Sequence, residues 1–114
     1  MIKKKEERRY EVRSGAFGGR GEIPRTHIFE ADETFGRCRL MIESVVPPGA
    51  SVGSHVHDKD TELYYVLEGR LTVIENGVSH ILGPGDASFT GGGDSHEYRN
   101  DSDAPVRMLA IVIN

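Results

Sequence analysis

The chain has 114 residues, enough for one domain but too few for two independent hydrophobic cores. Its formal net charge of -4 excludes the clear basic excess of a nucleic-acid-binding surface, and no apolar run approaches the length of a membrane span or a signal-peptide core. Cys38 is the only cysteine, which excludes an intrachain disulfide and predicts a reduced, cytoplasmic setting.

Fourteen glycines and five prolines predict many tight turns, as in an all-β protein rather than a helical bundle. We expect a single domain over residues 1–114, with an N-terminal arm over about 1–22 and a core over about 36–113. Within the arm, Tyr10 and Val12 alternate weakly with charged residues and predict an edge strand.

Residues 14–22 contain four glycines in nine positions. The segment lacks the lysine and the following serine or threonine of a P-loop, so a surface loop is the leading interpretation and phosphate binding a weaker one. A lid over a pocket is a third possibility, because glycines give a loop the hinge freedom that closure needs.

The rest of the chain is predicted to form short strands separated by glycine and proline turns. Residues 31–36 predict one helical turn or a loop, and Asn76-Gly77 predicts a hairpin. No segment shows sustained helical periodicity, so a total of about nine or ten strands predicts a sandwich or a barrel. The last strand is almost entirely apolar and should be buried on both faces, inside the domain or under a partner subunit. The predicted strands cover residues 23–30, 37–46, 63–67, 71–75, 78–82, 87–90, 96–99 and 106–113.

One stretch, residues 49–69, concentrates residue types that bind metals. His55 and His57 are two residues apart, so in an extended segment both imidazoles lie on one face of the strand. Glu62 follows five residues later, and together the three side chains predict an incomplete metal site. The candidates for a fourth ligand are the other three histidines, His27, His80 and His96.

The spacing around these residues resembles the first sequence motif of the cupin superfamily, G-x5-H-x-H-x3–4-E-x6-G. Its positions are occupied by Gly49, His55, His57, Glu62 and Gly69. A second stretch resembles the second cupin motif, G-x5-P-x-G-x2-H-x3-N. Its positions are occupied by Gly85, Gly93, His96 and Asn100, with Gly91 where the family has proline. The short spacer between the motifs is similar to that of small single-domain bacterial cupins of the oxalate-decarboxylase-like type.

The resemblance implies both a fold and a metal site. The fold would be a double-stranded β-helix, the jelly-roll barrel of the cupins. In that barrel the ligands of one cation would be His55, His57, Glu62 and His96. Three neutral imidazoles and one carboxylate suit a divalent transition metal such as Mn, Fe, Co, Ni or Zn. Four protein ligands on an octahedral ion would leave two positions for water, substrate or dioxygen, and the resemblance assigns no catalytic residue.

Two tyrosines have alternative interpretations. Tyr64 shares strand parity with Glu62 and should face the barrel interior. Tyr98 shares strand parity with His96 and should face the same way as that histidine. Either phenol would lie near the metal or pack in the core, and core packing is the favoured alternative.

Three other positions are weaker candidates for the site. His80 lies on the predicted hairpin and is interpreted as a surface residue. His27 would reach the pocket mouth if the N-terminal segment folds over it, but it is not expected to be a ligand. Gly91 would either crowd a ligand or bend a strand, because it allows close approach of the backbone.

Cupins include decarboxylases, dioxygenases, isomerases, epimerases and non-enzymatic binding proteins, so the fold alone does not determine the activity. The favoured hypothesis is a metal-dependent lyase or oxidoreductase acting on a small carboxylic or keto acid, with the metal stabilising developing negative charge. The alternative is a binding module that holds a small anion unchanged. A decarboxylase needs a proton donor, for which Glu22, Glu43 and Glu97 are only nominal candidates. A homodimer fits both hypotheses, because a partner would cover the apolar strand at 106–113.

Overall fold

The computed structural model describes residues 1–114 and confirms the all-β class. Its strands are β1 (Arg9–Ser14), β2 (Glu22–His27), β3 (Cys38–Val46), β4 (Ser51–His57), β5 (Thr61–Glu68), β6 (Leu71–Glu75), β7 (Val78–Leu82), β8 (Ala87–Thr90), β9 (Asp94–Arg99) and β10 (Val106–Ile113). Three short 3-10 turns complete it, η1 (Lys5–Glu7), η2 (Ala16–Gly18) and η3 (Asp32–Thr34). None of these helical turns has the length and apolar character needed to cross a bilayer.

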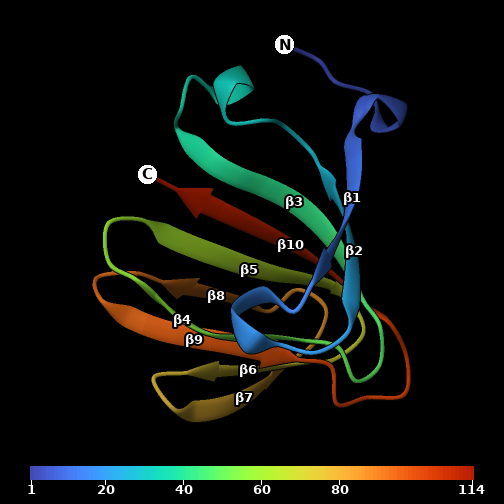
Figure 1. The fold of residues 1–114 in the computed structure, drawn as a ribbon, viewed down its shortest axis with the longest axis vertical. Coiled ribbons are helices and arrows are strands. Elements are labelled where there is room, and N and C mark those ends of the chain that lie inside the picture. The colour runs from blue at the N-terminus through green and yellow to red at the C-terminus, as the bar shows by residue number, and fades with distance from the viewer.

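The strands form two antiparallel sheets arranged as a jelly-roll barrel (Figure 1). The larger sheet has six strands in the order β1-β2-β3-β10-β5-β8, and the smaller has four in the order β4-β9-β6-β7. Strands far apart in the sequence therefore lie side by side, such as β3 with β10 and β4 with β9. This order brings the two histidine-bearing segments, β4 and β9, into one sheet.

The hydrophobic core fills the space between the two sheets. Val46, Val66, Leu71 and Val106 are fully buried and come from strands β3, β5, β6 and β10. Alternation of side chains along each strand places these residues on the inner faces. Burial of each such side chain contributes about 1.5–3 kcal/mol relative to exposure.

Strand β10 departs from the prediction of burial on both faces. Its residues alternate between buried and half-buried side chains, with Met108 and Ala110 inside and Leu109 and Ile111 on the outer face. The apolar sequence therefore belongs to a central strand of the larger sheet that is covered on one side within the chain. The partner subunit, offered as the other possible cover, stays a proposal.

Two of the predicted turns have a clear physical basis. Asn76 and Gly77 both have positive φ angles, 48° and 79°, and they connect β6 to β7 as the hairpin that the sequence predicts. At Gly91, a Cβ atom would overlap the side chain of Thr61. The missing proline is thus explained by the close approach of the turn to the start of β5.

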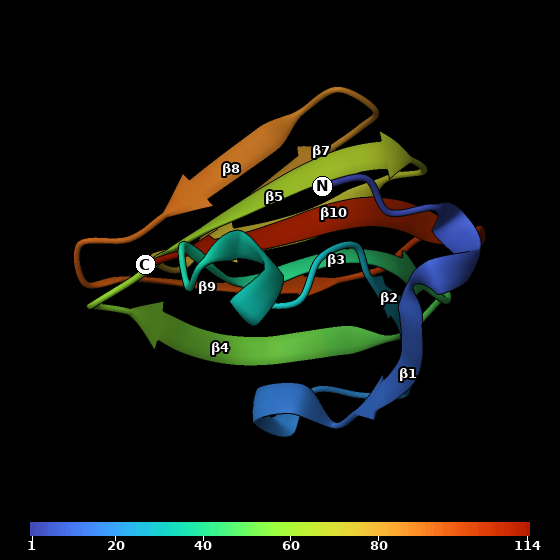
Figure 2. The ribbon, with the colours of Figure 1, turned by 90° about the horizontal axis from the view of Figure 1, so that it is seen from above.

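The N-terminal segment extends the larger sheet. Strand β1 pairs with β2 and forms the predicted edge of that sheet. Turn η2 follows β1 and contacts β4 of the smaller sheet, as Figure 2 shows from above. The glycine-rich segment at 14–22 is therefore packed against the barrel beside the strand that carries His55 and His57.

Candidate metal centre

Four side chains converge in the barrel interior, and they are those of the sequence motif. His55 and His57 point inward from β4, Glu62 from the start of β5, and His96 from β9. His55 lies directly opposite His96 in the antiparallel pairing of β4 with β9, so their side chains share one face of the sheet. One ligand atom from each of the four residues lies within 4.8 Å of the others.

The distances within this cluster suit one metal ion. Oxygen Oε1 of Glu62 is 3.4 Å from Nε2 of His55 and 3.0 Å from Nε2 of His57. Nε2 of His96 is 2.9 Å both from that oxygen and from Nε2 of His55. Neighbouring ligands of an ion with bonds of about 2.1 Å lie roughly 3.0–3.4 Å apart, so the four atoms could hold one cation.

The outer ring nitrogens of two histidines are fixed by hydrogen bonds. Nδ1 of His55 donates to the backbone oxygen of Gly53 at 2.9 Å, and Nδ1 of His57 lies 2.6 Å from the Asp60 carboxylate. Asp60 also pairs with Arg39. With Nδ1 held as the donor, loss of the proton from Nε2 frees a lone pair there, so each ring can present a metal-binding nitrogen to an ion in the cluster. Nδ1 of His96 is buried and has no partner.

The electrostatics of the cluster favour an ionised Glu62. Burial opposes its charge, but hydrogen bonds from His55 and His96 outweigh this and lower the pKa of Glu62 to about 2. Burial also opposes the charge of His55, yet the hydrogen bonds to Glu62 and Gly53 raise its pKa above the usual value. The carboxylate is surrounded by three imidazoles and has no arginine or lysine within ion-pairing distance. Such a group of side chains is suited to bind a cation.

Tyr64 packs in the core, which was the favoured alternative, and it also lies beside the cluster, so its place near a metal stays a proposal. Its side chain is 2% exposed and belongs to the core, and its ring stacks on that of His96 with centroids 4.4 Å apart. Its hydroxyl oxygen lies 3.1 Å from Nε2 of His96. Burial, followed by the charge of Glu62, raises the pKa of Tyr64 well above its usual value, so the phenol keeps its proton. Tyr98 is buried edge-on against Tyr64 and completes the core there.

A cavity of about 210 Å³ opens from the cluster to the surface. His55, His57, Glu62 and Tyr64 lie at its polar end, whereas the buried His96 does not line it. The other lining residues are Arg13, Ala16, Phe17, Ile23, Arg25, Arg39, Leu40, Ile42, Ser44, Val52, Tyr98, Ala110 and Val112. Glu62 is therefore the only carboxylate in the cavity wall, and it is a member of the cluster.

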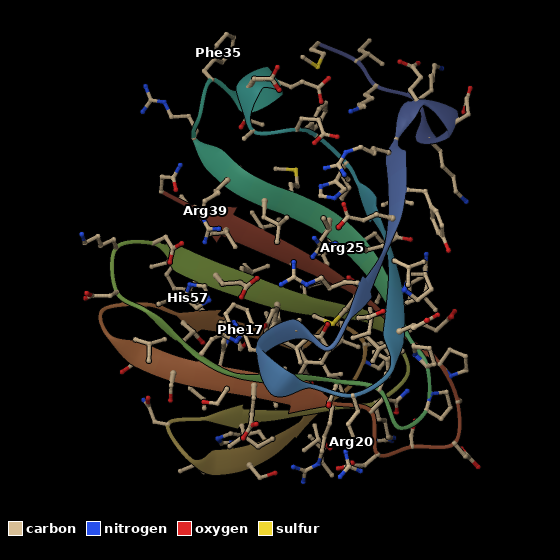
Figure 3. The ribbon with its side chains drawn as sticks, viewed as in Figure 1. Phe17, Arg20, Arg25, Phe35, Arg39 and His57 are labelled. Carbon is tan, nitrogen blue, oxygen red and sulfur yellow. The ribbon has the colours of Figure 1, made fainter.

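Three arginines line the cavity, and they differ in their partners. Arg25 is bound by the carboxylate of Glu11 at 2.6 Å, and Arg39 pairs with Asp60. Arg13 makes no ion pair and is exposed at the end of β1. Figure 3 shows the labelled Arg25 and Arg39 on the same open side of the barrel as His57. Arg13 is thus the one cavity arginine whose charge is free for a ligand.

The glycine-rich segment brings an aromatic ring to the cluster that sequence reasoning did not single out. Phe17 stacks on His55 with ring centroids 4.3 Å apart and an interplanar angle of 15°. Its backbone is left-handed, with φ 52°, and its carbonyl oxygen lies so close to Gly53 that a Cβ there would overlap it. This position agrees with a lid, the third of the three interpretations, and that role stays a proposal. The four glycines were the only available signal, and they do not predict the stacking.

The remaining sequence candidates lie outside the cluster. His27 is buried, with Nε2 3.1 Å from Glu11, and it does not line the cavity. His80 is exposed on β7, as expected. The nominal proton donors are also absent from the cavity wall. They are Glu22, exposed on β2, Glu43, near Arg8 and Arg107, and Glu97 on β9.

Comparison with known proteins supports the resemblance seen in the sequence. The family model described as Cupin domain matches residues 42–112, a stretch that includes all four clustered side chains. An oxalate-binding protein from Thermotoga maritima is 34% identical over 96 residues, which cover 84% of this chain and 79% of that protein. A quercetin 2,3-dioxygenase from Bacillus subtilis is 35% identical over 74 residues, which cover 65% of this chain but 22% of the dioxygenase.

A solved structure has nearly the same fold over its full length. The crystal structure of a predicted oxalate decarboxylase from Thermotoga maritima aligns with a TM-score of 0.92 and 33% sequence identity. The alignment covers 99% of this chain and 98% of that chain. The likeness therefore includes β1, β2 and the segment between them, not only the motif-bearing strands.

Proposed function

The chain belongs to the cupin family, and on that basis we propose that it binds one divalent transition metal ion and a small carboxylate anion in the same cavity. The ligands of the ion would be His55, His57, Glu62 and His96. One observation carries the proposal, namely that three Nε2 atoms converge on one oxygen of Glu62 at 2.9–3.4 Å. The ion would act there as a Lewis acid that stabilises negative charge on the bound acid.

The charges in the cavity support an anionic ligand. A divalent ion beside one ionised glutamate leaves a net positive charge, and no second carboxylate lines the wall. Arg13 adds a free guanidinium at the rim, and a guanidinium can bind a carboxylate through two parallel hydrogen bonds. The name of the Thermotoga maritima relative, oxalate-binding protein, agrees with this class of ligand.

Catalysis on a carboxylic or keto acid is the second candidate function, as a metal-dependent lyase or oxidoreductase. The hydroxyl of Tyr64, 3.1 Å from His96 at the polar end of the cavity, favours it, because it can donate a hydrogen bond to a bound oxygen. Decarboxylation through a carboxylic acid donor is disfavoured, because Glu22, Glu43 and Glu97 lie outside the cavity wall. Binding of an anion without turnover needs neither the Tyr64 hydroxyl nor a carboxylic acid donor.

One experiment tests both parts of the proposal. The protein is stripped with a chelator, reloaded separately with Mn²⁺, Ni²⁺ and Zn²⁺, and titrated with oxalate in a calorimeter. We expect one metal per chain and heat of oxalate binding only in a reloaded sample. Oxalate recovered unchanged after incubation supports a binding module, and a new product supports an enzyme. Equal binding to stripped and reloaded protein would contradict the proposal.

We also propose that the outer face of the larger sheet pairs with a second copy of the chain. The strand register aligns two rows of side chains on this face, Met41, Ile111, Leu63 and Phe89 in one and Glu43, Leu109, Tyr65 and Ala87 in the other. Seven of these eight side chains are apolar or aromatic, and Phe89 is 59% exposed. Sedimentation at micromolar concentration should give a dimer, and Leu109→Glu should give a monomer. A monomeric parent protein would contradict this pairing.

A further inference from the structure

Much of the cavity wall is apolar. Six aliphatic side chains from β2, β3, β4 and β10 form this part, namely Ile23, Leu40, Ile42, Val52, Ala110 and Val112. Apart from the polar end and the three arginines, the only polar side chains in the wall are those of Ser44 and Tyr98. A second carboxylate that faced the aliphatic side chains would lose its hydration without gaining a hydrogen bond from them, which is unfavourable. An apolar group placed there would be removed from water and would stabilise the complex.

The arginine side chains near these walls already form ion pairs within the protein. The guanidinium of Arg25 makes two contacts with Glu11, at 2.6 and 2.8 Å, and Arg39 is paired with Asp60. The free Arg13 lies at the exposed end of β1. The interior between the polar end and the rim therefore has no unpaired cation for a second acidic group.

Phe17 supplies an apolar surface at the mouth of the same cavity. The residue is 61% exposed, although it lines the cavity and its ring stacks on His55. The left-handed backbone that places it there is uncommon for a bulky residue. Phe35 has the same left-handed conformation, with φ 56°, but is 90% exposed and lies far from the barrel opening (Figure 3). The two rings thus differ in whether a cavity ligand can reach them.

We propose that the ligand of this site is a monocarboxylic acid with an apolar side chain, such as a 2-oxo acid, larger than oxalate. This proposal rests on the proposed function and adds the chemical class of the ligand. The acid's oxygens lie at the polar end beside the four clustered residues, and its apolar body lies against the aliphatic walls and under Phe17. The volume of about 210 Å³ equals that of roughly seven waters at about 30 Å³ each, which leaves space beyond the polar end.

A homologous series of acids tests the proposal. Metal-reloaded protein is titrated with oxalate, pyruvate, 2-oxobutanoate and 4-methyl-2-oxopentanoate, and the dissociation constants are compared. Each buried carbon should tighten binding about fourfold, so the last acid should bind up to ~60-fold more tightly than pyruvate. It should also bind more tightly than oxalate.

Two pairs of variants locate the apolar contact. Phe17→Ala should lower the ratio of the pyruvate dissociation constant to that of 4-methyl-2-oxopentanoate about fourfold, and Phe35→Ala should leave that ratio unchanged. The ratio is the readout because a disturbed metal would weaken both acids alike. Val52→Thr, which adds a hydroxyl to the wall at nearly constant volume, should also lower the ratio. Val12→Thr, the same change on the exposed side of β1, should not.

The outcomes separate this proposal from the proposed function. If the affinity does not change along the series but oxalate binds tightly and only with metal, the proposal of an apolar ligand is wrong. The proposed metal and anion site then still stands. A rising series that Phe17→Ala and Val52→Thr do not alter also overturns the proposed contact. No metal-dependent binding of any acid overturns both.

Discussion

Two clusters in the molecule contain a buried histidine next to a glutamate, and only one of them has the geometry of a metal site. At the end of β2, Nε2 of His27 is 3.1 Å from Glu11. In the barrel, Nε2 of His57 is 3.0 Å from Glu62. Both glutamates have a pKa of about 2, so neither the distance nor the acidity distinguishes the two clusters.

The difference lies in the other partners of each carboxylate. Glu11 is bound by the guanidinium groups of Arg25 and Arg9, each within 2.6 Å, so its charge is already balanced. Glu62 has no guanidinium beside it; its only ion-pair partners are imidazoles, and two of these have their Nδ1 atoms fixed by Gly53 and Asp60. A metal site therefore requires lone pairs that point inward and a charge that the protein leaves unbalanced.

The largest expected effect separates the two clusters directly. His96→Ala removes one ligand and should weaken the binding of Ni²⁺ to stripped protein by more than about 100-fold, because even partners of the ligands contribute 10–100-fold. His27→Ala, the control from the other cluster, should leave the affinity within about twofold. Competition with a chromogenic chelator measures both. Equal losses in the two variants would remove the distinction between the clusters.

The next effect tests the partners of the ring nitrogens. Asp60→Asn keeps the size of the side chain but removes the negative charge near Nδ1 of His57, and it should weaken Ni²⁺ binding by about 10–100-fold. Glu11→Gln makes the same chemical change beside His27 and should have no effect on the metal. Unchanged affinity in Asp60→Asn would show that the hydrogen bond does not orient the ligand.

A smaller effect is expected at the rim of the cavity. Arg13→Gln should weaken oxalate binding to the metal-loaded protein about 2- to 5-fold, because the free guanidinium is exposed and screened by salt. The loss should shrink as the salt concentration rises. Arg20→Gln provides the control, because Arg20 is exposed and lies outside the wall of this cavity, apart from Arg25 and Arg39 in Figure 3. An equal loss in both variants would indicate a general charge effect.

The smallest effect concerns stability in acid. Burial opposes the charge of Glu11, but Arg25 and Arg9 lower its pKa from 4.5 to about 2. The group therefore adds stability that is fully present above pH 4.5 and is lost as the pH falls toward 2. Glu11→Gln should remove about 1 kcal/mol of this pH-dependent stability, after allowance for solvent screening. Urea unfolding of metal-free protein at pH 6 and pH 3 measures it, and an identical pH dependence in the variant would contradict it.

Much of the fold was accessible from the sequence because it depends on local rules. Asn76-Gly77 requires a tight hairpin wherever it lies between strands, and the alternation at Tyr10 and Val12 specifies an edge strand. The inward direction of Tyr64 follows from its parity with Glu62. The convergence of the four motif residues was accessible for another reason, the resemblance to cupins, and their binding of a metal stays a proposal.

What could not be predicted depends on contacts between distant segments. Phe17 reaches His55 because its carbonyl fits against Gly53, and nothing in the local sequence of either segment encodes that approach. Likewise, the burial of β10 on one face depends on what packs against each face of the larger sheet, whereas its composition alone suggested two buried faces. The unpartnered Nδ1 of His96 is a property of the assembled core.

Anomalous X-ray diffraction from crystals of Ni²⁺-loaded protein would locate the ion directly. We expect one anomalous peak per chain, about 2.0–2.2 Å from Nε2 of His55, His57 and His96 and from an oxygen of Glu62. A peak beside His27 and Glu11, or no peak within the barrel, would contradict this expectation.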